Sequence, residues 1–389
     1  MENSLSFDKT LMDSLETKIT VSKWDETLQA YDQNRYKDAL LTLLDYIDVN
    51  IRKKYGNADE TYFKVPHGSI VVEIEITDDK IKIVAPFLKI GAANKIPIFR
   101  RIAEINFSPL NLAQIRYEND ELNFFFETPL PLCEPYKIYY VLEEICHKAD
   151  NYDDEFIDAF QVEGLHEPKI TQFSADVKTT IWEKLNAYLD EAFSYIEYFD
   201  QKRIGYFNWD IISITLKRME YYMSPQGKLR TDIEKEVAQM GDSYIHINDR
   251  IHNGKQFLQR LKSMEKEELL KDFYISESFI PIKGRCDLNR VKQNFERPFN
   301  TSSGEIQKGD YIGATLSLLL GFYDMFYYDM VPADVSDKAA AALSTAAGKP
   351  WKDAASILHN GMDAIINDKP SPYKIKSTEK KGFFSSLFK

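Results

Sequence analysis

The stretch GSIVVEIEITDDKIKIVAPFLKI, residues 68–90, decides the fold class of the first part of the chain. Every second residue from Ile70 to Ile76 is apolar, Asp78 and Asp79 interrupt the pattern, and it resumes at Ile81. Alternation with a period of two places the apolar side chains on one face of a strand. The stretch therefore predicts a β-hairpin that has one buried face and turns at the paired aspartates.

The segments around this hairpin predict helices and a second hairpin. Apolar residues at steps of three and four indicate helix over residues 23–54, with a break between two short helices near Asn34. The other predicted elements are a strand near 62–65, a short helix that begins at Pro97, a hairpin that turns at 118–120, and a closing helix from residue 135. The order α-β-β-α-β-β-α is typical of an α+β fold, an antiparallel sheet with covering helices.

An acidic cluster ends the closing helix, in the sequence LEEICHKADNYDDEF at residues 142–156. We expect the helix to end near Asp150, so that Asp153 and Asp154 cap a further short helix. A protein-contact edge and a metal site are the alternatives. A calcium loop needs a central glycine, which this stretch lacks, so we predict no metal here.

The second half of the chain is predicted to be all-α, because its apolar residues recur at helical spacing. Prolines and glycines predict an irregular stretch at residues 273–305 within this half. The first half is predicted to consist of an N-terminal segment at 1–22, the α+β domain at 23–160 and a linker at 161–175. The second half is predicted to consist of a helical domain at 176–272, an irregular connection at 273–305, a helical block at 306–370 and a flexible tail at 371–389. Whether the helical block packs against the preceding helices is left open.

Composition limits the compartment and the partners. The 389 residues carry a formal net charge of −12, and a negative surface repels phosphate backbones, so we expect no nucleic acid as partner. The sequence has no run of about 18 apolar residues and no basic, apolar leader, which argues against stable membrane insertion and secretion. Three widely spaced cysteines form no disulfide or metal pattern. These features predict a cytoplasmic protein with reduced thiols.

The sequence carries no recognisable catalytic motif. The six histidines form no HExxH pattern, and there is no GxSxG elbow, phosphate-binding loop or dinucleotide fingerprint. Cys146 lies on the apolar face of its helix and is expected in the core. We therefore predict no catalytic residue, no cofactor and no metal. An enzyme whose site is assembled from distant residues stays open, because motifs do not describe every active site.

Two groups of apolar residues are candidates for protein binding. Aromatic-rich helices hold more rings than one helix face can bury, which favours either an aromatic core or a groove or dimer contact. The lysine-rich tail cannot bury its own apolar residues, so it is a disordered end, a segment that docks on protein or on the chain's own aromatic groove, or a weak membrane contact. The candidates are Tyr221, Tyr222, Phe326 and Tyr327 in the helices and Phe383, Phe384, Leu387 and Phe388 in the tail.

The block over roughly residues 25–160 resembles type III secretion chaperones and the YbjN-like proteins related to them. The resemblance is carried by the first hairpin, by KIPIFRRIAEINFSPLNLAQIRYENDELNFFFETPL at 95–130, and by a closing helix that ends HKADNYDDEF. It implies a non-enzymatic domain that binds an extended segment of another protein, often as a dimer. Those chaperones are short, single-domain proteins, and the added helical half departs from that pattern.

The sequence therefore predicts a bacterial-type, non-enzymatic adaptor or chaperone-like protein. We expect its half-exposed sheet to leave an apolar surface for an extended or helical segment of another protein, at the hairpins of residues 70–90 and 113–128. A self-assembling scaffold subunit, including a homodimer, is the alternative function. An enzyme without a motif-defined active site is the third.

Overall fold

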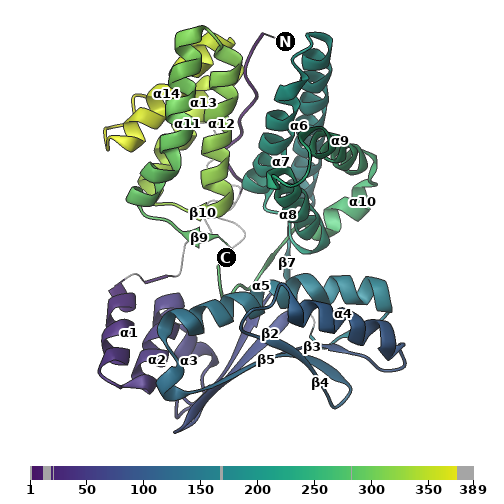
Figure 1. Ribbon diagram of the computed structural model, residues 1–389, viewed down its shortest axis with the longest axis vertical. Coiled ribbons are helices and arrows are strands. Elements are labelled where there is room, and N and C mark those ends of the chain that lie inside the picture. The colour runs from purple at the N-terminus through teal and green to yellow at the C-terminus, as the bar shows by residue number, and fades with distance from the viewer. Residues whose placement is uncertain (1, 12–18, 21, 167–169, 282, 375–389) are drawn as a thin grey trace.

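The computed structural model confirms an α+β part followed by an all-helical part (Figure 1). It describes residues 2–11, 19–20, 22–166, 170–281 and 283–374, except for the side chains of Asp150, Asn151 and Arg285. The α+β part, residues 22–164, and the helical part, residues 175–366, have separate hydrophobic cores. The two parts lie one above the other in Figure 1.

An antiparallel sheet forms the base of the α+β part. The order β1-β2-β3-β5-β4 places β3 at the centre, and β6 pairs with one end of β3. Both predicted hairpins and the predicted extra strand are confirmed. The strands are β1 (Tyr62–His67), β2 (Ile70–Ile76), β3 (Lys80–Lys89), β4 (Gln114–Glu118), β5 (Glu121–Pro129) and β6 (Glu163–Gly164).

Helices cover one face of this sheet. The break predicted near Asn34 is confirmed, but the short helix begins at Lys95 rather than Pro97, because the Asn94 side chain caps it by accepting a hydrogen bond from the Ile96 amide at 3.1 Å. The helices are α1 (Ser22–Asp32), α2 (Tyr36–Ile47), α3 (Ile51–Tyr55), α4 (Lys95–Phe107), the 3₁₀ turn η1 (Leu130–Leu132) and α5 (Pro135–Phe160).

The predicted helix end near Asp150 is wrong, because α5 continues without a break to Phe160. Its buried stripe runs through Ala149 and Phe156, so packing on the sheet holds the helix through the acidic cluster. Asp153 lies on that buried stripe and accepts a hydrogen bond from the Ser69 hydroxyl, next to the start of β2. The acidic cluster is therefore partly a contact between α5 and the sheet.

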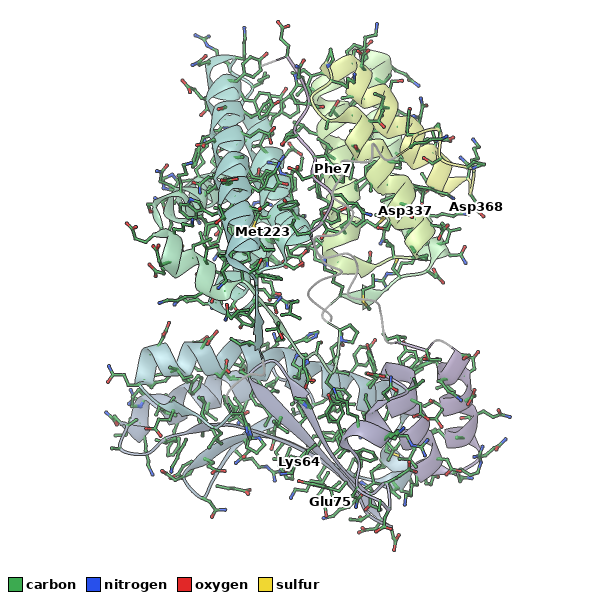
Figure 2. The ribbon with its side chains drawn as sticks, turned by 180° about the vertical axis from the view of Figure 1, so that it is seen from behind. Phe7, Lys64, Glu75, Met223, Asp337 and Asp368 are labelled. Carbon is green, nitrogen blue, oxygen red and sulfur yellow. The ribbon has the colours of Figure 1, made fainter. Side chains whose placement is uncertain are left out.

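The opposite face of the sheet is open but charged. Lys64 and Glu73 form an ion pair across β1 and β2 at 2.8 Å, and the Arg116 guanidinium lies 3.5 Å from the centre of the Phe125 ring. Figure 2 labels Lys64 and Glu75 on this part of the sheet, and both side chains are exposed. The sheet is half-exposed as predicted, and on its open face Val71, Val84 and Phe125 are half-buried among these charged side chains.

The helical part consists of two groups of helices joined where α7 packs on α12. The first group holds α6 (Ala175–Gln201), η2 (Gly205–Phe207), α7 (Asn208–Met223), α8 (Gly227–Gly241), α9 (Ile247–Ser263), α10 (Lys266–Leu269) and η3 (Leu270–Asp272). The second holds α11 (Leu288–Lys308), α12 (Tyr311–Tyr328), α13 (Ala333–Ala346) and α14 (Trp351–Ile366). The short strands are β7 (Ile170–Gln172), β8 (Tyr274–Ser276), β9 (Gly284–Arg285) and β10 (Asp329–Met330), paired as β7 with β8 and β9 with β10.

The prediction of an irregular connection at 273–305 is wrong over its second half, which forms α11. Val291 and Phe295, one turn apart, are both fully buried and hold the helix in the core. Pro298 lies inside this helix, and its ring packs against Gly321 of α12, where a Cβ atom would come within 2.9 Å of the proline Cγ. A glycine on the neighbouring helix thus makes room for a residue that usually breaks helices.

One segment of the helical part enters the core of the α+β part. Phe279 and Ile280 are buried there, and the Phe279 amide donates a hydrogen bond to Nδ1 of His67 at 3.1 Å. The Gly68 amide donates to the Glu277 carbonyl at 2.9 Å. These contacts, together with the β7–β8 pair between two segments far apart in sequence, fasten the two parts to each other.

Close packing of α13 on α14 predicts that replacing Gly361 by alanine destabilises the protein. A Cβ atom at Gly361 would lie 2.4 Å from the Cβ of Ala342, closer than packed carbons approach. Gly361→Ala should lower the free energy of unfolding by about 1 to 3 kcal/mol despite the better helix propensity of alanine. Urea denaturation measures the change.

Gly304→Ala is the matched control, since a Cβ atom added at this position of α11 would meet no described neighbour within 4 Å. It should raise stability by about 0.5 to 1 kcal/mol. Equal effects of the two substitutions would contradict the packing argument.

Candidate functional site

Helix α4 is apolar on two faces. Ile98, Ile102 and Ile105 are buried against the sheet. On the outer side, Ile96 is 65% exposed and Phe107 is 90% exposed. An amphipathic surface helix normally buries one apolar stripe and turns polar residues outwards. The second stripe therefore has no role in the core of this chain.

The outer stripe continues onto the neighbouring sheet edge. The Phe99 ring lies 5.1 Å from the ring of Tyr117 on β4, and the Lys95 ammonium group donates a hydrogen bond to the Tyr117 hydroxyl at 2.5 Å. In the part of the chain that the structure describes, β4 is the outermost strand on its side of the sheet. We call this area the α4 surface, formed by Ile96, Phe99, Phe107, Leu112 and Tyr117, which are all at least 39% exposed.

The α4 surface has the chemistry of a protein contact. Clustered exposed apolar side chains with a polar rim mark interaction sites on soluble proteins. Glu104 is exposed beside the stripe, and Arg100, four residues after Ile96, lies within it and adds a positive charge. The edge strand β4 is partly capped, because the Asn106 side chain of α4 accepts from the Ile115 amide at 2.7 Å and donates to the Ile115 carbonyl at 2.9 Å.

A second group of exposed aromatic residues lies where α1 meets the start of α5. Tyr136 and Tyr140 are 49% and 56% exposed, and Leu132 beside them is 58% exposed. The Trp24 ring packs on Tyr136 with 4.7 Å between ring centres, and its indole N–H donates to the Tyr136 hydroxyl at 3.3 Å. Because these rings contact one another, this group has fewer apolar faces left for a partner than the α4 surface.

The aromatic residues that the sequence singled out in the helices lie inside the helical part. Tyr221, Tyr222 and Phe326 are buried, and Tyr327 is half-buried. Tyr221 packs between Phe326, with ring centres 4.4 Å apart, and the chain's own Phe7, at 6.0 Å. The first three are therefore covered in the folded chain, and part of the cover over Tyr221 is the ring of Phe7. The tail candidates Phe383, Phe384, Leu387 and Phe388 lie outside the described residues.

Sequence reasoning missed the α4 surface although a signal was present. The helix sequence KIPIFRRIAEINF places apolar side chains at 96, 98, 99, 102, 105 and 107, more than one face of a helix can hold. The excess shows that some apolar residues must be exposed. Only the sheet shows which of them, because it selects Ile98, Ile102 and Ile105 for burial.

A groove of about 600 Å³ between α7, α11 and α12 gathers ionisable side chains. Asp324 pairs with Lys217, and Asp329 accepts a hydrogen bond from Asn294 at 3.1 Å and lies 3.8 Å from Arg290. Most of these charges thus compensate one another. The other polar residues lining the groove are Asp210, Arg297, Thr301 and Ser317.

Asp210 is the most perturbed carboxyl group of this groove. Burial raises its pKa to about 7, and the nearby Glu305 carboxylate adds to the increase. Glu305 accepts a hydrogen bond from the Ser317 hydroxyl at 3.1 Å, and burial raises its pKa as well. Asp210 can therefore bind or release a proton near neutral pH, a property that active-site carboxyl groups share.

The remaining ionisable candidates are packed side chains. Burial lowers the pKa of His147 to about 3, and burial raises the pKa of the Cys133 and Cys286 thiols to about 11. Within the described residues, no cluster of three His, Cys, Asp or Glu side chains could hold a metal ion. No helix among those residues is long and apolar enough to cross a membrane.

Comparison with known proteins adds no relative. No family model, no curated protein and no solved structure matches the chain. The resemblance to type III secretion chaperones and YbjN-like proteins therefore stays a prediction, whereas the α+β and all-α fold classes are observed.

The raised pKa of Asp210 predicts how stability depends on pH. An unfolded aspartate has a pKa of about 3.9. Between pH 4 and pH 7 the native state therefore binds a proton that the unfolded state has lost, and stability falls as pH rises. An asparagine cannot ionise, so Asp210→Asn removes this fall in stability. The variant should therefore be more stable than the wild type at pH 8 by about 2 to 4 kcal/mol.

Urea denaturation at pH 4 and pH 8 measures the effect, and the two proteins should differ little at the lower pH. Asp249→Asn is the matched control, because Asp249 also lies in the first turn of a helix, α9, but is exposed. A stability gain at pH 8 that equals the gain at pH 4 would contradict the buried-carboxyl explanation.

Proposed function

We propose that this chain is a non-enzymatic protein-binding protein, an adaptor or chaperone-like module, that binds another protein through the α4 surface. The observation that carries the proposal is the second apolar stripe of α4, with Phe107 90% exposed while the opposite stripe is buried. Burying a large apolar side chain contributes about 1.5 to 3 kcal/mol. The five side chains of the α4 surface can therefore form the centre of a stable contact.

An elongated partner segment can lie along α4 and the edge strand β4, where Phe99 and Tyr117 would contact its side chains. The backbone of β4 offers such a segment little, because the Ile115 amide donates to the Asn106 side chain at 2.7 Å and the Ile115 carbonyl accepts from it at 2.9 Å. A helical segment that packs along Ile96 and Phe107 uses the same surface. The resemblance of the α+β part to secretion chaperones agrees with either form of partner. We place the encounter in the cytoplasm, because the three cysteines are free thiols.

A scaffold subunit that assembles with copies of itself is the alternative, and it would bury the same α4 surface. A second candidate function is the binding of a small ligand in the groove beside Asp210, because that carboxyl group titrates near neutral pH. Ser317→Arg would fill the groove and leave the α4 surface unchanged, so it separates the ligand-binding function from partner binding.

Charged substitutions on the outer stripe of α4 test the proposal. Ile96→Asp combined with Phe107→Asp should leave the fold intact, because both side chains are exposed. The change should weaken partner binding by tenfold or more, since apolar residues at the centre of a contact carry most of its energy. The measurement is affinity capture from the native host with quantitative mass spectrometry, followed by hydrogen exchange of residues 95–118 in the purified complex.

Tyr244→Asp is the matched control, because Tyr244 is 99% exposed but lies in the helical part. It should capture the partner as the wild type does. Sedimentation of the purified proteins distinguishes the scaffold alternative, in which the double variant dissociates an oligomer that forms without any partner. A partner retained in full by the double variant would reject the α4 surface as its binding site.

A further inference from the structure

The N-terminal residues belong to the helical part, although the sequence places them before the α+β part. Residues 2–11 run as an extended strand between α6 and α7 on one side and the α13–α14 pair on the other (Figure 1). Figure 2 shows Phe7 between these two groups of helices. We call this stretch the N-terminal strand segment. It fills a groove whose walls are more than 170 residues away in the sequence.

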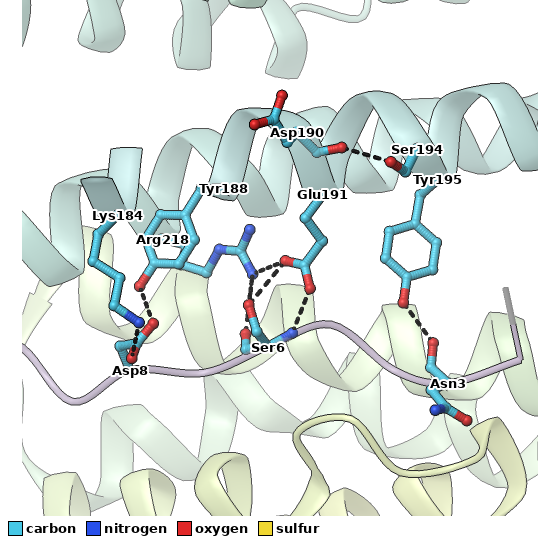
Figure 3. A network of polar contacts seen from close by, with 10 residues as sticks. All are labelled: Asn3, Ser6, Asp8, Lys184, Tyr188, Asp190, Glu191, Ser194, Tyr195 and Arg218. Carbon is cyan, nitrogen blue, oxygen red and sulfur yellow. Dashed lines mark hydrogen bonds and ion pairs between the residues drawn. The ribbon is translucent and has the colours of Figure 1, made fainter. Parts of the chain in front are cut away.

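The groove binds the backbone of the segment from both sides. The Ser4 amide donates to the Lys349 carbonyl at 2.7 Å, and the Leu11 amide donates to the Tyr222 carbonyl at 2.9 Å. The Tyr195 hydroxyl donates to the Asn3 carbonyl at 2.6 Å (Figure 3). Backbone contacts of this kind give affinity for an extended chain whatever its side chains.

Side chains of the segment alternate between two environments. Leu5 is 3% exposed and lies in the helical core, and Phe7 stacks on Tyr221. Between and beyond them, Ser6 donates to Glu191, and Asp8 accepts from Lys184 at 2.6 Å and from the Tyr188 hydroxyl at 3.0 Å. The groove therefore contacts successive leucine, serine, aromatic and aspartate side chains on alternate sides of an extended backbone, which makes it selective for that pattern.

Arg218 lies at the centre of the groove. Its side chain is fully buried over the Tyr188 ring, 4.0 Å from the ring centre. Its Nη1 donates to the Ser6 carbonyl at 3.0 Å and to Glu191 at 2.6 Å (Figure 3). Its Nε and Nη2 have no hydrogen-bond partner within the described part of the chain. A buried guanidinium with unused donors can serve a further acceptor on a bound chain.

The walls of the groove contact each other independently of the segment. Helix α7 packs along α12, Lys217 pairs with Asp324, and the rings of Tyr195 and Trp351 lie 5.8 Å apart across α6 and α14. None of these wall contacts involves a residue of the N-terminal strand segment, although Leu5 of the segment belongs to the helical core.

We propose that this groove is a second peptide-binding site, whose ligand is an extended segment of a partner protein with the pattern leucine-serine-aromatic-aspartate. The chain's own residues 4–8 occupy it in the absence of that partner. The groove lies on the helical part, so the proposal does not depend on the α4 surface. A tethered segment acts at an effective concentration on the order of millimolar, so the partner must bind more tightly than the N-terminal strand segment does as a free peptide.

The test measures binding of a fluorescein-labelled peptide with the sequence of residues 2–11 to the full-length chain by fluorescence anisotropy. In the full-length variant Phe7→Ala/Asp8→Lys, the occupant loses its ring contact and its attraction to Lys184. This variant should bind the peptide saturably and at least tenfold more tightly than the wild type, whose groove is occupied. A peptide that carries the same two substitutions should bind at least tenfold more weakly.

Glu2→Gln is the matched control chain, because Glu2 contacts the groove through its backbone carbonyl, which accepts from the Trp351 amide at 3.3 Å and is kept by the substitution. It should behave like the wild type. The single variant Asp8→Lys keeps the Phe7 contact and serves if the double variant fails to fold. Absence of saturable peptide binding to both variants, or equal binding by the wild type, would show that the segment is a fixed part of the core and overturn the proposal.

Discussion

One-sided burial of the antiparallel sheet is the constraint from which the α+β part follows. The inner positions of β2, β3 and β5 are apolar and require a cover, and α4 and α5 provide it with their isoleucine-rich stripes. The outer positions carry paired charges, which keep the open face in water. Since α4 is already fixed by its buried stripe, its outer apolar residues are held rigidly at the edge of the sheet.

The helical part is organised by close contacts between α7 and α12 and by glycines where other helices approach. Gly321 leaves room for the Pro298 ring, and Gly361 leaves room for the Ala342 side chain. The helices of the second group therefore approach each other more closely at these points than they could with a larger residue in place of either glycine. Fully buried Arg218 is tolerated because Glu191, the Tyr188 ring and the backbone of the N-terminal strand segment surround it. An early segment of the chain thus completes a core whose other buried residues lie between Phe173 and Ile365.

The two parts suggest a division of tasks. The α4 surface is exposed and apolar, whereas the groove of the helical part is polar at its centre and already occupied. Phe279 and Ile280 connect the core of the α+β part to the chain of the helical part.

Much of the fold followed from the sequence alone. Alternation predicted both hairpins and the buried face of the first, and helical periodicity predicted helix over residues 23–54, the closing helix from residue 135 and an all-α second half, because these signals need only neighbouring residues. The tertiary structure alone decided where Leu5 and Phe7 pack, that α11 is helical despite Pro298, and which stripe of α4 stays exposed. Each of these depends on a surface supplied by residues far away in the chain, and no local pattern encodes that surface.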